Sequence, residues 1–275
     1  MKNYVIKVIA ILTILTITSC EKVIDVDLET APEKIVIDAA IQWKKGTTGN
    51  EQKIRLTTTT SYFNTTVPVF SGATVTITNN TNNAIFTFIE TPNTGNYLCN
   101  NFVPIIGNSY TLKVLANNQL YVATDRLLAT PTITDVEQKT VSGFEGDEIQ
   151  IKYFYQDNGL ENNYYLLTVK QNNLIVPEFG VTDDKFFQGN QMFGFYTEEN
   201  LKPTDILDLS VQGISESYFN YMSKLISISN SGGNPFSTPP ATLRGNLKNE
   251  TIPKNFPLGY FSLGEVDTKN YTVQN

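Results

Sequence analysis

Histidine is absent from the 275-residue chain, and cysteine occurs only at Cys20 and Cys99. The lack of histidine removes the most common general base, the Ser-His-Asp and Cys-His arrangements, and the imidazole ligands of metal sites. If Cys20 carries lipid, as argued below, only Cys99 is left, which excludes an internal disulfide and a cysteine-based zinc site. Cys99 is expected to be a small buried hydrophobe. We therefore expect a protein that is not an enzyme and needs no cofactor.

Charged residues are also scarce, at 17% of the chain, and the formal net charge is −7. Surfaces that bind nucleic acid are basic, so this composition argues against a nucleic-acid partner and against docking on anionic lipid by charge. Aromatic residues are plentiful, with 14 tyrosines and 16 phenylalanines. The length allows one large or two ordinary domains, and the aromatic residues allow a sizeable core.

Long hydrophobic runs are missing except near the start, where two early lysines precede an apolar stretch over residues 8–17. That stretch is shorter than the roughly 20 residues of a spanning helix, and it ends at Ser19 and Cys20. A basic end, a short apolar run and a small residue before a cysteine predict a lipoprotein export signal over residues 1–19, with diacylation of Cys20. The alternative is a buried strand or membrane helix with an incidental cysteine.

Lipid on Cys20 would hold the rest of the chain at a membrane without a transmembrane segment, because two acyl chains anchor far more firmly than one. Residues 20–33 are predicted to be a tether, although the alternation within them is also compatible with an edge strand. Acidic residues that follow a lipidated cysteine are associated with surface export in Bacteroidetes-type bacteria. We therefore expect an outer-membrane, lipid-anchored protein that faces the cell surface.

Short β-branched runs separated by Gly, Asn or Pro turns dominate the remaining chain, and this spacing predicts a β-sandwich. The predicted first domain covers residues 34–130, with hairpins around the Asn-rich turn at 79–83 and around Asn117-Asn118. The second predicted domain, residues 131–275, is also β-rich. Its pattern changes near residues 215–230, where apolar residues recur at spacings of three and four. That segment is the one helix we predict, with Ser215 or Ser217 as its cap.

Several of these segments together resemble a known family. They are the Gly-Ala-Thr-Val-Thr-Ile run at 72–77, the Gly-Gly-Asn-Pro-Phe segment at 232–236, and the segments at 20–27, 217–221, 239–241, 244–247 and 258–261. The chain resembles the Bacteroidetes lipoprotein family labelled "domain of unknown function 4249" over nearly its whole length. The resemblance implies an immunoglobulin- or transthyretin-like sandwich in the first domain. It also implies an accessory of an outer-membrane machine such as a TonB-dependent transporter, and it supplies no catalytic or ligand residues.

Carboxylates are the only catalytic material in the chain, in the pairs Asp183-Asp184 and Glu198-Glu199 and at Asp205 and Asp208, which flank a predicted strand start. Two carboxylates at a suitable separation could cleave glycosides, but adjacent acids on a strand point to opposite faces. We therefore interpret these acids mainly as solvated loop residues, with a calcium site and a carboxylate-based surface glycosidase as alternatives.

Aromatic side chains next to glycines are the better functional lead, because aromatics suit contact with a protein or glycan as well as core packing. The candidate partner-contact residues are Phe186, Phe187, Phe193, Phe195, Tyr196, Pro235 and Phe236. The alternative for these residues is core filling, or packing of the proline-rich loop over the sandwich.

The function predicted from these features is a lipid-anchored binding or accessory subunit of a TonB-dependent transporter or similar outer-membrane β-barrel. A structural or assembly component of an envelope complex is the alternative from another class.

Overall fold

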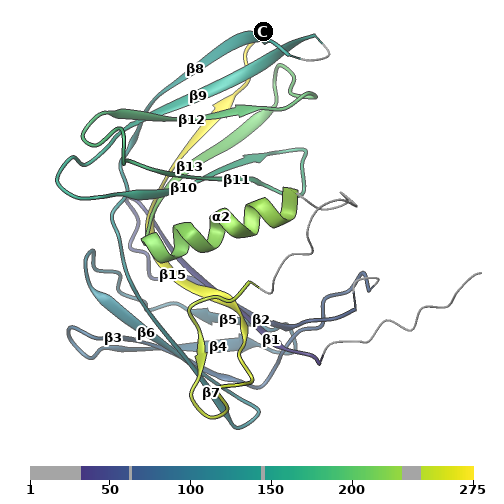
Figure 1. Cartoon of the computed structure of the whole chain (residues 1–275), viewed down its shortest axis with the longest axis vertical. Helices are drawn as coiled ribbons and strands as arrows, with labels where there is room; N and C mark the ends of the chain where they lie inside the picture. The colour runs from purple at the N-terminus through teal and green to yellow at the C-terminus, as the bar shows by residue number, and fades with distance from the viewer. Residues whose placement is uncertain (1–31, 62–63, 144–145, 231–242) are drawn as a thin grey trace, which may run out of the picture. The chain divides into compact units, whose positions relative to one another are not determined.

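The computed structural model describes residues 32–61, 64–143, 146–230 and 243–275 (Figure 1). The predicted signal, Cys20, most of the predicted tether, Pro235 and Phe236 lie outside the described residues. Residues 33–275 form one compact unit. Their described part is mainly β, with 15 strands and one helix, as predicted. No helix within it has the length and hydrophobicity needed to span a bilayer.

The first half of this unit folds into a sandwich because most of its strands alternate between buried and more exposed residues. In β1, for example, Ile37, Ala39 and Ile41 are fully buried, whereas the residues between them face the other side. The hydrogen-bonded order is β1-β2-β5-β4-β3-β6-β7-β14. Those strands are β1 (Ile35–Lys44), β2 (Gln52–Thr58), β3 (Thr74–Asn79), β4 (Ile85–Thr91), β5 (Asn96–Cys99), β6 (Ser109–Ala116), β7 (Gln119–Arg126) and β14 (Lys248–Asn249).

Two predicted hairpins of this half are confirmed by the pairing of β3 with β4 and of β6 with β7. Asn117 and Asn118 have φ angles of 46° and 58°, the left-handed values that a tight two-residue hairpin turn requires. Asparagine tolerates this conformation better than most residues, so the turn sequence itself selects the hairpin.

The second half is another sandwich, in which a three-stranded sheet, β12-β9-β8, packs against β11-β10-β13-β15. Between the sheets lies a core rich in tyrosine, including Tyr153, Tyr155, Tyr165 and Tyr196. Its strands are β8 (Ile133–Ser142), β9 (Asp147–Gln156), β10 (Tyr164–Gln171), β11 (Glu178–Asp183), β12 (Gln191–Thr197), β13 (Ile206–Ile214) and β15 (Leu258–Thr272).

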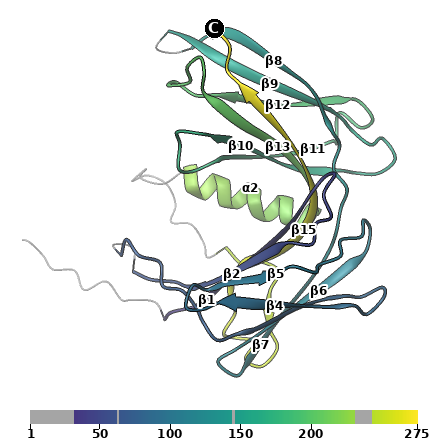
Figure 2. The ribbon, with the colours of Figure 1, turned by 180° about the vertical axis from the view of Figure 1, so that it is seen from behind.

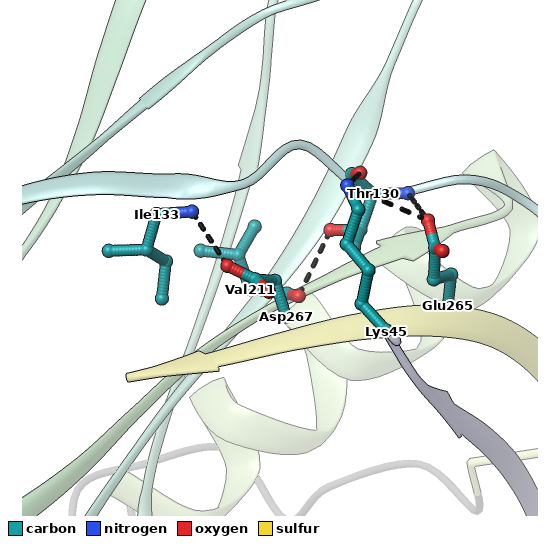
Figure 3. A network of polar contacts seen from close by, with 6 residues as sticks. All are labelled: Lys45, Thr130, Ile133, Val211, Glu265 and Asp267. Atoms are coloured by element: carbon teal, nitrogen blue, oxygen red, sulfur yellow. Dashed lines mark hydrogen bonds and ion pairs between the residues drawn. The ribbon is translucent and has the colours of Figure 1, made fainter. Parts of the chain in front are cut away.

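Strand β15 connects the two halves because its 15 residues pair with partners in both of them. Its first part runs parallel to β1, and its second part runs antiparallel to β13 (Figures 1 and 2). The Asp267 carboxylate of β15 also accepts the N–H of Ile133 at 2.7 Å (Figure 3). The sequence pattern predicted a strand only over residues 258–263, because most of the residues from 264 to 272 are glycine, charged or polar.

A polar network around Thr130 fastens the connection between β7 and β8 to this strand (Figure 3). The Thr130 N–H donates to Glu265 Oε2 at 3.0 Å, and its hydroxyl donates to the Val211 carbonyl at 3.0 Å. The Lys45 ammonium donates to the Thr130 carbonyl at 2.8 Å and lies 4.0 Å from the Glu265 carboxylate. Glu265 and Thr130 are buried, so these bonds satisfy groups that water reaches poorly.

Helix α2 (Glu216–Asn230) confirms the single predicted helix. The Ser215 hydroxyl accepts the N–H of Tyr218 at 3.4 Å, and the Ser215 carbonyl accepts the N–H of Phe219 at 2.9 Å, so Ser215 caps the first turn. The helix packs beside β10, β11 and β15 (Figures 1 and 2). Only Tyr218 and Met222 of the helix are buried, so much of its inner face borders open space.

Candidate ligand-binding groove

A groove with a volume of about 1020 Å³ lies between α2 and the sheet. This size is at the upper end of the roughly 300–1,000 Å³ of small-molecule sites. Its floor comes from β1, whose odd-numbered residues enter the first core. The even-numbered residues therefore face the groove; they are Val36, Asp38, Ala40 and Gln42.

Three tyrosine rings form one wall of the groove. Tyr260 of β15 stands beside Asp38 in the β1–β15 register. The ring centroids of Tyr218 and Tyr221, both from α2, each lie 4.7 Å from that of Tyr260. Tyr218 and Tyr260 are buried, and Tyr221 is half-buried. The helix and the strand thus place an aromatic cluster next to a carboxylate.

Apolar side chains from the β10–β11 connection form the opposite wall. Leu174 and Val176 lie in the connection, Phe179 follows on β11, and Leu225 faces them from α2. Val176 is 73% exposed, and the other three are about 40% exposed (42%, 40% and 39%). Exposed apolar residues gathered around a concavity are typical of a ligand or partner site.

The Asp38 carboxylate has no close counter-ion. The described residues contain two ion pairs, Lys45 with Glu265 and Lys139 with Glu137, and neither involves Asp38. Asp38 is exposed on the side of β1 that faces the groove, and the surrounding walls of the groove remove part of the water from its carboxylate. This partial desolvation raises the pKa of Asp38, and the positive charges of Lys53 and Arg55 on β2 oppose the rise.

Glu178 and Glu198 place further negative charge in the groove lining. Burial raises the pKa of Glu178, and repulsion by Glu198 raises it further. Beside them, Tyr196 is buried, and its hydroxyl donates to Gln171 Oε1 at 2.8 Å. Burial and these carboxylates raise the pKa of Tyr196 to about 12. Burial raises the pKa of Tyr218 and Tyr221, and the negative charge of Asp38 raises each further, so the two acidic positions act on different rings.

Among the described residues, the groove lining contains neither lysine nor arginine. Within the described ranges, no group of three or more histidine, cysteine or acidic side chains is placed to hold a metal ion. The groove therefore offers aromatic faces, aliphatic walls and carboxylates, which can bind and orient a ligand.

Asp125 lies on β7 near the start of α2. Its carboxylate accepts the N–H of Arg126 at 2.9 Å and the hydroxyl of Ser215 at 3.3 Å. Burial raises the pKa of Asp125 to about 6, although these bonds and the N–H of Leu263 lower it. Asp125 thus connects the first half of the unit to the helix cap.

The predicted partner-contact residues fall into two groups. Phe193 and Phe195 lie on the outer face of β12, at 46% and 62% exposure, and the ring of Phe193 packs 6.0 Å from that of Phe154. Phe186 and Phe187 lie in the β11–β12 connection, at 82% and 51% exposure.

Tyr196 requires a correction, because its 2% exposure removes it from any contact surface shared with those phenylalanines. It directly follows Phe195 in a strand, and neighbouring strand residues face opposite sides. That rule was the signal available in the sequence.

The fold gives the predicted acidic residues different surroundings. Asp184 is only 2% exposed and accepts the N–H of Asn163 at 2.8 Å, so its interpretation as a solvated loop residue is wrong. Asp205 accepts the side-chain amide of Gln171 at 3.0 Å and the N–H of Lys202 at 2.9 Å, which is a structural role. Glu198 reaches the groove. Cys99 is buried, as predicted.

Sequence reasoning missed Asp38 and the three groove tyrosines. Asp38 precedes all three tyrosines by more than 170 positions, and their segments come together only in the folded chain. One signal was present: Asp38 is the only polar residue in the first seven positions of β1, and it stands at a non-core position.

These features define a mainly β protein built of two sandwiches, with a helix-bordered groove as its candidate binding site. The chain belongs to the family described as "Domain of unknown function (DUF4249)", which matches residues 21–270. No curated protein matches the chain.

Solved structures similar to the chain include the following three. A two fibronectin type-III domain segment from chicken tenascin shares 9% identity, with 60% of this chain and 85% of that chain covered and a TM-score of 0.22. A cytokine receptor complex shares 9% identity, covering 68% and 86%, with a TM-score of 0.25. The FN1–FN3 domains of chicken CNTN1 share 11% identity, covering 66% and 59%, with a TM-score of 0.21. At these values the similarities say nothing about function.

Proposed function

We propose that the protein is a binding protein that holds a small ligand in the α2 groove. The observation that carries this proposal is the groove itself, about 1020 Å³ of space walled by aromatic and aliphatic side chains and supplied with a few carboxylates. Apolar walls with a small number of placed polar groups are the usual design of a ligand site. Apolar burial supplies affinity, and the polar groups supply orientation.

Binding fits this geometry better than catalysis. An acid–base mechanism needs two groups that act on the same atoms. Glu178 and Glu198 lie near each other, since Glu198 raises the pKa of Glu178. Asp38, however, affects Tyr218 and Tyr221 and not Tyr196, so the three carboxylates of the described lining do not gather at one point. Nothing in the lining is a nucleophile with an adjacent base, and the chain contains no histidine.

The proposal extends to the protein's place in the cell. Lipid on Cys20 would anchor it at the outer membrane of a Bacteroidetes-type bacterium, with the body at the cell surface. There it would serve a TonB-dependent transporter or similar β-barrel. The anchor would raise the effective concentration of the loaded protein beside the barrel, as linking two binding modules does. The export pattern before Cys20 and the resemblance of the chain to outer-membrane lipoproteins support this part.

The test is a mild-detergent pull-down of the tagged full chain from its own membranes, with mass spectrometry of both proteins and small molecules. A groove-filling variant, Ala40→Trp, and an anchor variant, Cys20→Ala, serve as controls. We expect a small molecule enriched with the wild type over Ala40→Trp, and a transporter barrel recovered with the wild type but not with Cys20→Ala.

Equal small-molecule recovery from wild type and Ala40→Trp would remove the groove as the ligand site. Recovery of an assembly or secretion barrel in place of a transporter would favour a structural role in the envelope.

A further inference from the structure

The groove around Asp38 combines a carboxylate with tyrosine rings, and this combination points to the chemical class of the ligand. The inference rests on the proposed binding function. Asp38 and Tyr260 are register partners on adjacent parallel strands, so their side chains leave the same face of the sheet. The rings of Tyr218 and Tyr221, both on α2, pack against the Tyr260 ring, and each ring centroid lies 4.7 Å from that of Tyr260. A carboxylate therefore sits at the edge of a three-ring aromatic cluster.

We propose that the groove takes a ligand with an organic ammonium group attached to an apolar body. The ammonium group would lie between the Asp38 carboxylate and the rings of Tyr221 and its neighbours, and the body would lie along the aliphatic wall. Aromatic faces attract cations through their quadrupole, and this attraction grows as water is excluded. A carboxylate beside the rings adds a full opposite charge.

The charges that line the groove select against the other ligand classes. In the part of the lining that the structure describes, Asp38, Glu178 and Glu198 are the only ionisable residues apart from tyrosine, so an anionic ligand would meet repulsion there and no partner. A bare metal ion would want several oxygen ligands at once. Asp38 stands apart from the Glu178 and Glu198 pair, and no metal-holding cluster exists in the described part of the chain. A neutral sugar would leave Asp38 desolvated without a charge partner.

Two cationic side chains, those of Arg55 and Lys53, lie near Asp38. Arg55 is the cross-strand partner of Asp38 on β2, and Lys53 lies two residues before it. Neither comes within 4.0 Å of the carboxylate, since the ion pairs of the described residues do not include it. Both side chains are exposed and solvated, and neither lines the groove. They weaken the negative potential at Asp38 without neutralising it, so removal of Arg55 should strengthen cation binding.

Isothermal titration calorimetry on the full lipidated chain in lipid nanodiscs, with empty nanodiscs subtracted, tests the proposal. The probes are 3-hydroxyphenyltrimethylammonium, its uncharged isostere 3-tert-butylphenol, and 3-hydroxybenzenesulfonate. We expect the cation to bind about tenfold more tightly than the neutral isostere, and the sulfonate not to bind. Asp38→Asn and Tyr221→Leu should each weaken the cation about tenfold and weaken the neutral probe by much less. Arg55→Gln should tighten the cation, and Glu250→Gln, an exposed acid outside the groove, should change nothing.

The outcomes separate the two proposals. Equal binding of the cation and the neutral isostere, both lost in Ala40→Trp, would keep the groove as a ligand site and overturn the ammonium inference. The same inference falls if Asp38→Asn leaves cation affinity unchanged. Binding of none of the probes, together with no small-molecule enrichment over Ala40→Trp in the pull-down, would overturn both. The gain expected from Arg55→Gln cannot be mimicked by a variant that merely unfolds.

Discussion

Asp125→Asn should stabilise the protein near neutral pH and have no such effect in acid. The folded-state pKa of Asp125 is raised from 3.8 to about 6 by burial. Raising the pKa of an acid means that the native state binds the proton more tightly than the unfolded chain. Stability from this group is therefore fully present below pH 3.8 and is lost as pH rises through 6.

The magnitude follows from the shift. One pKa unit corresponds to about 1.4 kcal/mol, so a shift of about two units costs the wild type at most about 3 kcal/mol above pH 7. Asparagine avoids this cost, keeps an oxygen for the Arg126 N–H, and has an amide that can donate to the Ser215 hydroxyl. For a chain of this size, 1 kcal/mol moves the melting temperature by about 2–4 °C.

The assay is chemical or thermal unfolding of both proteins between pH 3.5 and pH 8. Asp208→Asn, an exposed aspartate on β13, is the matched control and should show no pH-dependent gain. The reasoning is refuted if Asp125→Asn is less stable than the wild type at pH 8 by the same amount as at pH 4. That result would mean that the bonds to Arg126 and Ser215 outweigh the desolvation of the charge.

Four further substitutions test the packing, each by urea unfolding. Tyr155→Phe should leave the free energy of unfolding unchanged or raise it, because the buried Tyr155 hydroxyl finds no hydrogen-bond partner among the described residues. Tyr165→Phe should lower the free energy of unfolding by about 1.5–3 kcal/mol, because the Tyr165 hydroxyl donates to the buried Asp157 carboxylate at 2.7 Å. Equal losses of stability in the two variants would contradict this contrast. Gly213→Ala should cost about 1–3 kcal/mol, because the new Cβ would lie 1.9 Å from a backbone oxygen, that of Ala129; a loss below about 0.5 kcal/mol would show that the backbone shifts freely there. Phe261→Ala should cost about 3–5 kcal/mol, since the Phe261 side chain is fully buried on the strand that both halves share; a loss typical of a surface site would contradict its place in the core.

Local sequence patterns predicted most of the individual elements. The alternation in β1 and β3 predicted strands, and the 3.6-residue pattern around Tyr218 predicted the helix. The Asn117-Asn118 pair predicted a hairpin turn. Each of these signals is contained within a few neighbouring residues, so it can be read without knowing the fold.

The candidate site could not be predicted in the same way. Asp38 and Tyr260 become neighbours only because β1 and β15 pair in parallel, which no local pattern specifies. Glu198 belongs to the groove, and Glu199, adjacent in sequence, does not line it. Asp184 was interpreted as solvated because acidic residues usually are. Its burial depends on the backbone N–H of Asn163, a contact across 21 residues.

The sequence by itself determined the mainly β character, the position of the one helix among the described residues, the buried state of Cys99 and the exclusion of histidine chemistry. These properties depend on composition and on periodicity, which a chain carries whatever its partners are. Only the tertiary structure decided that β15 joins both sandwiches, that α2 borders a groove, and that three tyrosines meet one carboxylate there. The physical reason is that alternation assigns a side chain to one of two faces, whereas long-range strand pairing and helix packing decide what covers each face.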